Sequence, residues 1–126
     1  MQDLAIFSLG HERSRWLAAR VSKISANVAN ADTPGYKAQD IGAFETTLSK
    51  AKVQLARTQP GHIEPDGDFA RGYDFVMRPS TETKYSGNTV SLEVEMASLG
   101  DARSQQSLTT GVLGAFHRML LSSSKG

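Results

Sequence analysis

The stretch ISANVANADTPGYKAQD, from Ile24 to Asp40, contains the sharpest structural break in this chain of 126 residues. Its first half has the alanine-rich composition of a helix, and its second half contains Thr33-Pro34-Gly35-Tyr36. Pro34 pushes the preceding Thr33 out of the helical region. Gly35 then supplies the positive φ that a type II turn requires. The sequence therefore predicts a helix that ends before Pro34 and a turn that follows at once.

Two asparagines, Asn27 and Asn30, stand near the end of this helix, where Glu or Lys would suit a helix better. Each lowers helix propensity by under about 0.7 kcal/mol relative to the best helix formers. In return, each amide offers two N–H donors and one acceptor oxygen. One interpretation is that both amides merely fray the helix end. We favour the other, in which they bond to backbone groups or to a neighbouring chain, and Asp32 is a further candidate for such a bond.

The segment before the turn, about residues 2–30, reads as one long helix. Leu17, Val21, Ile24 and Val28 are spaced by four, three and four residues, which is the spacing of a coiled coil. The helix also carries small residues that would let a second helix approach closely: Ala18, Ala19, Ala26 and Ala29.

A second long helix is predicted over about residues 88–121. It has three glycines that weaken it, Gly100, Gly111 and Gly114. Its apolar positions follow helical spacing with a polar middle: Leu92, Met96, Leu99, Leu113, Phe116 and Leu120. Its candidate N-caps are Asn88, Thr89 and Ser91.

Between the helices, residues 37–87 have a different composition. Ala43–Ala56 has the pattern of a short helix, and Arg57–Gly87 is rich in proline and glycine. Short apolar runs such as Phe75–Met77 favour short strands in an otherwise irregular segment. We therefore divide the chain into residues 1–36 (helix and turn), 37–87 (loose, partly extended middle) and 88–126 (C-terminal helix).

The predicted fold is mainly α, with the two terminal helices paired as an antiparallel, coiled-coil-like hairpin. The middle segment leaves the first helix at Tyr36 and returns at Gly87, which favours this arrangement within one chain. The hairpin would bring Leu92 and Met96 near Val28. Each helix has more apolar surface than one partner covers, which suits a subunit packed among copies or relatives.

Composition excludes several classes of protein. The chain has no cysteine, so it has neither disulfides nor thiolate metal sites. Its formal net charge is only +1 and no basic block stands out, which gives no case for nucleic-acid binding. No run approaches the roughly 20 apolar residues of a membrane span, and we expect no cleaved signal peptide.

No catalytic, metal or cofactor motif is evident. His11, His62 and His117 are isolated along the chain. Asp66–Asp74 resembles a calcium loop in part, but Ala70 and Arg71 occupy positions that an EF-hand loop gives to a ligand and a glycine. We expect a protein that is not an enzyme and that has no metal and no cofactor.

The opening stretch closely resembles the signature of bacterial flagellar basal-body rod proteins, in which a helix ends in Asn-x-x-Asn before a Thr-Pro-Gly turn. Ser86–Ala97 and Leu55–Ile63 resemble two further shared segments, and the short length is most similar to the proximal rod branch. Ser91 departs from the pattern, which has an acidic residue there. The signature residues are Asn27, Asn30, Ala31, Asp32, Thr33, Pro34, Gly35 and Tyr36.

The resemblance implies a structural subunit that polymerises helically into the drive shaft of the flagellum, in the periplasm. It implies export in an unfolded state by the flagellar type III apparatus. The implied partners are copies of the chain, other rod proteins, the export-gate adaptor FliE and the membrane-ring protein. The helix-packing or subunit-interface positions would be Leu17, Val21, Ile24, Val28, Leu92, Met96, Leu99, Leu113, Phe116 and Leu120. The alternative is a soluble helical adaptor or chaperone-like binding module.

We predict that the isolated chain is largely disordered in buffer and gains its helices on assembly. Hydrophobic residues make up 39% of the chain and aromatic residues 7%, which is a sparse supply for a core. Helix propensity alone does not hold such helices. Circular dichroism of the purified monomer tests this, and a strongly helical monomer that melts cooperatively would contradict it.

Overall fold

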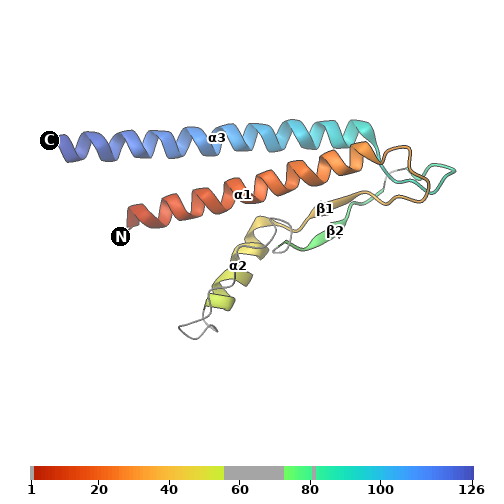
Figure 1. Cartoon of the computed structure of the whole chain (residues 1–126), viewed down its shortest axis with the longest axis horizontal. Helices are drawn as coiled ribbons and strands as arrows, with labels where there is room; N and C mark the ends of the chain where they lie inside the picture. The colour runs from red at the N-terminus through yellow and green to blue at the C-terminus, as the bar shows by residue number, and fades with distance from the viewer. Residues whose placement is uncertain (1, 56–72, 81) are drawn as a thin grey trace.

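The computed structural model describes residues 2–55, 73–80 and 82–126. Two long helices dominate it, α1 (Gln2–Ala29) and α3 (Leu92–Lys125). They lie side by side in opposite directions, so that both chain termini are at the same end (Figure 1). The mainly helical fold and the antiparallel hairpin predicted from the sequence are confirmed.

The middle segment forms a small arm beside α1 (Figure 1). It contains β1 (Gln39–Ile41), α2 (Phe44–Leu55) and β2 (Phe75–Met77). The two strands form an antiparallel ribbon in which Gln39 pairs with Met77 and Ile41 with Phe75. The short helix and the Phe75–Met77 strand were expected from the sequence. His62, the shared segment around it and most of the calcium-like stretch lie outside the described residues.

Contacts at both ends of the helix pair fix its register. Near the termini, the rings of Phe7 and His117 meet edge to face with their centroids 6.4 Å apart. At the opposite end, the Asn27 amide donates a hydrogen bond to the Glu95 carboxylate over 3.1 Å. As the residue number increases along α1, the number of its contact partner on α3 decreases, as an antiparallel pair requires.

The core lies where α1, β1 and α3 meet, and it is small. Trp16 anchors it, packing its ring at 62° to that of Phe44 and donating its indole N–H to the Gly42 carbonyl oxygen over 2.9 Å. The polar edge of the indole is thus satisfied while its apolar body is buried. The buried members of this cluster are Trp16, Leu17, Ile41 and Ala102. In the described residues, no helix is long and apolar enough to span a bilayer.

At Gly10, α3 packs so closely against α1 that there is no room for a side chain. A β-carbon built there would lie 2.4 Å from Leu113 Cδ2. At Gly100, in contrast, an added β-carbon meets nothing within 4 Å. Glycine therefore serves helix packing at the first position and has no such role inside the subunit at the second.

We predict that Gly10→Val weakens the hairpin by about 1–3 kcal/mol, because the added methyl groups overpack the contact with Leu113. The measurement is helicity by circular dichroism during a titration with TMAO, an osmolyte that favours burial. Gly10→Val should fold at higher TMAO, and adding Leu113→Ala should partly reverse the shift. The matched control Gly100→Ala should fold at lower TMAO, since alanine gains about 1 kcal/mol of helix propensity. Equal shifts for the two glycine variants would contradict the packing role of Gly10.

Candidate assembly site: the signature turn and its buried polar network

The turn after α1 has the geometry that its sequence indicates. The Tyr36 N–H donates to the Thr33 carbonyl oxygen over 3.3 Å, with Pro34 and Gly35 between them. Gly35 has a φ of 73°, the left-handed value expected from a type II turn. An added β-carbon at Gly35 would meet nothing within 4 Å, so only the backbone conformation demands glycine here.

The returning chain docks directly onto this turn. The Gly35 N–H donates to the Ser86 carbonyl oxygen over 2.8 Å, and the Thr89 N–H donates to the Tyr36 carbonyl oxygen over 3.0 Å. Gly87 also has a positive φ, 79°, and a β-carbon there would lie 3.5 Å from the Gly35 α-carbon. The middle segment therefore begins and ends at one place, as the hairpin prediction assumed.

Asn88 fastens this return and was considered from the sequence only as a helix cap. Its buried amide donates to the carbonyl oxygens of Asn30 and Thr33, both over 2.8 Å. Its side-chain oxygen accepts from the Val90 N–H over 2.8 Å. It thus adds a second hydrogen bond to two carbonyl oxygens just after α1, which also accept the Thr33 and Tyr36 N–H groups. Ser91 takes the N-cap position of α3, without a capping hydrogen bond from its side chain.

Asn27 is the centre of the network. Its side chain is fully buried, and its amide donates to the Gln39 carbonyl oxygen over 2.7 Å and to Glu95 over 3.1 Å. Its oxygen accepts from the Gln39 N–H and from the Tyr36 hydroxyl, each over 3.2 Å. Asn27 therefore pairs with both backbone groups of a β1 residue, as a neighbouring strand would, and joins α1, the turn, β1 and α3.

Asn30 acts locally. Its amide donates to the Ala26 carbonyl oxygen over 2.8 Å, and its oxygen accepts from the Thr33 hydroxyl over 3.1 Å. Both partners lie within one helical turn of it. The two asparagines therefore differ: one holds distant segments together, and the other closes the end of its own helix.

Glu95 and Arg78 form the ionic part of the network, and sequence reasoning missed both. Glu95 is fully buried, and its carboxylate lies 3.1 Å from Arg78 Nε in an ion pair rather than an aligned hydrogen bond. Arg78 follows β2 and also donates to the Ser98 hydroxyl over 2.9 Å. A buried carboxylate without such partners would be very costly. The arginine therefore ties the ribbon to the start of α3.

Asp40 links this arginine to α1. Its carboxylate lies 3.1 Å from Arg78 Nη2 and 3.3 Å from Arg20 Nε, and it accepts the Ile41 N–H over 2.8 Å. Arg20 reaches onward to Asp101 on α3 over 3.3 Å. The positive and negative groups therefore alternate from α1 through β1 and β2 to α3.

The remaining signature residues divide by burial. Ala31 is buried in a second small cluster with Ala38 and Val90, against which Tyr36 packs. Asp32, Thr33 and Pro34 are exposed at the tip of the turn. The signature therefore has a buried face that holds the chain together and an open face.

The apolar positions expected at helix or subunit contacts also divide. Leu17 and Ile24 are buried, and Leu92 and Met96 are exposed by 51% and 59% on α3. The fully buried side chain at this end of α3 is Glu95. The others are half-buried: Val21, Val28, Leu99, Leu113, Phe116 and Leu120.

The polar side chains of this site bond to other segments of the chain. Asn27, Asn88 and Glu95 are fully buried, so no substrate reaches them. In the described ranges, no group of three or more histidine, aspartate or glutamate side chains is arranged to hold a metal ion.

Comparison with known proteins decides the family. The sequence profile of the family described as "Flagella basal body rod protein" matches residues 17–37, which include Asn27 and the turn. The flagellar basal body rod protein FlgB of Agrobacterium fabrum is 31% identical over 128 residues, covering 96% of this chain and 93% of the relative. The chain belongs to the flagellar basal body rod protein family. FlgB of Salmonella typhimurium is 32% identical over 78% of this chain and 77% of its own, and FlgB of Aeromonas hydrophila is 39% identical over 60% and 59%.

Membership of the rod protein family gives the network its setting. The chain is a structural subunit of the flagellar basal body rod and not an enzyme. The matched residues 17–37 cover the second half of α1, which carries Leu17 and Asn27, and the whole turn that follows. The family resemblance drawn from the sequence is confirmed.

We predict that Asn27→Ala prevents rod assembly and that Asn30→Ala is far milder. The first change removes one hydrogen-bond partner from the β1 backbone groups, the Tyr36 hydroxyl and Glu95, at about 1–3 kcal/mol for each group left buried and unsatisfied, while Glu95 keeps its ion pair with Arg78. The second removes only bonds within one turn of helix. Swimming zones on soft agar, with secretion of the subunit measured in parallel, distinguish the two variants. Equal swimming of both strains would refute the hub role of Asn27.

Proposed function

We propose that this chain is a subunit of the proximal rod, polymerising helically as part of the drive shaft that transmits torque. The observation that carries the proposal is the buried network, which joins both long helices and the ribbon through residues of the rod signature. Similarity to FlgB proteins across nearly the whole chain supports the same place in the rod.

A subunit that transmits torque needs helices that do not slide past each other. In this chain, Asn27 and Arg78 cross between helix and ribbon, and Arg20 crosses between the helices. Directional contacts of this kind fix register, which an apolar seam alone does weakly. The design suits torque transmission by the helix pair.

The proposed partners are copies of the chain, other rod proteins and, at the rod base, the adaptor FliE and the membrane-ring protein. The chain would reach the periplasm through the flagellar type III export apparatus, in an unfolded state and without a cleaved signal. The small core of the described residues supports export in an unfolded state, because few buried apolar side chains must be separated there.

We assign four roles along the chain. Residues 2–36 and 88–126 are assigned to the inner helical layer, and the described parts of the middle segment, residues 37–55, 73–80 and 82–87, to an outer arm. The signature from Asn27 to Tyr36 sets the direction in which the chain leaves the inner layer. The exposed Leu92 and Met96 are proposed to contact other subunits, because the hairpin leaves them uncovered.

The test is Gly35→Val in a strain that lacks the chromosomal copy. Valine at a φ of 73° is strained by more than the roughly 1–2 kcal/mol of an ordinary residue, because it is β-branched. We expect secretion of the subunit to persist, since an unfolded chain has no turn, and swimming to be lost. Gly35→Asn is the matched control, because asparagine tolerates this conformation, and it should swim. Normal swimming of Gly35→Val would refute the role of the turn, and loss of its secretion would assign the motif to export.

A further inference from the structure

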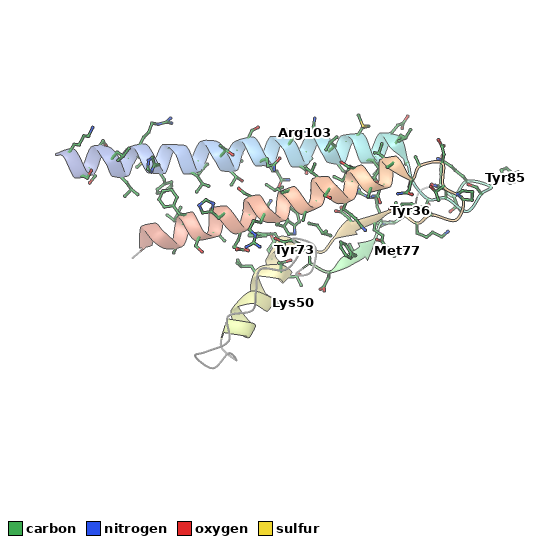
Figure 2. The ribbon with its side chains drawn as sticks, viewed as in Figure 1. Tyr36, Lys50, Tyr73, Met77, Tyr85 and Arg103 are labelled. Atoms are coloured by element: carbon green, nitrogen blue, oxygen red, sulfur yellow. The ribbon has the colours of Figure 1, made fainter. Side chains whose placement is uncertain are left out.

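A shallow apolar groove lies beside α1, on the ribbon side. Its volume is about 380 Å³, and Tyr73 and Phe75 from the arm form one wall. Figure 2 shows Tyr73 on the side of α1 that faces away from α3. The α1 wall is made of small side chains: Ala18, Ala19, Ser22 and Ala26. Small residues on one side and aromatic rings on the other leave room for large side chains from elsewhere.

The groove carries a single positive charge among its lining residues, Lys23. Its ammonium lies 4.2 Å from the centroid of the Phe75 ring, in a cation–π contact at the rim. Burial, with the nearby Glu12 carboxylate adding to the effect, raises the pKa of Tyr73 above its usual value. The phenol is therefore neutral under physiological conditions, and the wall that it forms has no negative charge.

A ridge of complementary character stands at the start of α3. Leu92 and Met96 are one helical turn apart, and both are more than half exposed. Glu93 lies between them in the sequence, is exposed, and makes no ion pair or hydrogen bond with any described residue. The ridge thus combines large apolar side chains with one free negative charge.

We propose that the groove receives the Leu92–Met96 ridge of a second copy of this chain, with that copy's Glu93 placed against Lys23. The groove runs from Ala18 to Ala26, about 12 Å of helix, and the ridge occupies about 6 Å. Opposite charges at the two rims fix the orientation. This inference rests on the proposed rod function and names the surfaces that the subunits use.

The two surfaces are different parts of the same chain, so the contact is heterologous. A heterologous contact that does not close into a ring generates an open helical assembly. One subunit offers its ridge to the next and its groove to the previous one. A rod can therefore grow from this single pair of surfaces.

The first experiment is charge exchange in a strain that lacks the chromosomal copy. Lys23→Glu and Glu93→Lys should each reduce the swimming zone at least several-fold, and the double variant should recover most of it. Lys125→Glu, a reversal at the far end of α3, is the control and should swim normally. Failure of the double variant to improve on both singles would overturn the pairing.

The second experiment locates the contact directly, because the chain has no native cysteine. Two copies of different length, one with Ser22→Cys and one with Met96→Cys, are expressed together, and basal bodies are isolated and oxidised. A disulfide-linked pair that requires both cysteines supports the inference. Basal bodies that contain both copies without this link, or with either cysteine joined only to a different rod protein, overturn the inference alone. Absence of the chain from basal bodies overturns the proposed function as well.

Discussion

The side-chain amide of Asn27 makes four hydrogen bonds where water does not reach. Two of them go to the backbone of Gln39, so α1 takes the place of a neighbouring strand for β1. A short ribbon in isolation is marginal in water. Here the β1 edge of the ribbon is held by a helix through the Asn27 amide, and the other elements pack around it.

The ionic chain from Arg20 to Glu95 extends this joint. Asp40 receives two arginines, and Arg78 contacts a carboxylate on the ribbon and another on α3. Buried ion pairs contribute little net stability against apolar residues of similar size, but loss of one partner costs about 3–5 kcal/mol. The network is therefore better understood as a device that selects one arrangement of the helices than as the source of their stability.

Local chemistry explains what the sequence predicted. The end of α1 and the turn follow from Pro34 and Gly35, and the strand at Phe75–Met77 follows from an apolar run between turn residues. These features depend on neighbours within a few positions. The family resemblance rested on the same short segments.

The burial of Glu95 did not follow from local chemistry. The helical stripe of α3 has two possible phases at its start, and hydrophobicity favours the one that buries Met96. The structure buries Glu95 in its place, because Arg78 and Asn27, distant along the chain, both reach it. The periodicity of apolar residues along one helix does not reveal a partner that is distant in the sequence. The role of Asn88 was missed for the same reason, because its partners are the carbonyls of Asn30 and Thr33, which precede the middle segment in the chain.

The arm is closed at its base by one more bond, in which the Gly42 N–H donates to the Asp74 carbonyl oxygen over 2.7 Å. The hydrogen bonds and ion pairs of Asn27, Asp40 and Arg78 lie on the near side of this bond, and Phe44, just beyond it, packs on Trp16. The chain beyond it leaves and returns at a fixed pair of points, and lengthening such a loop twofold costs only about 0.6 kcal/mol. A peptide tag or a whole domain inserted into the chain well beyond Phe44 would thus leave the joint between the helices intact.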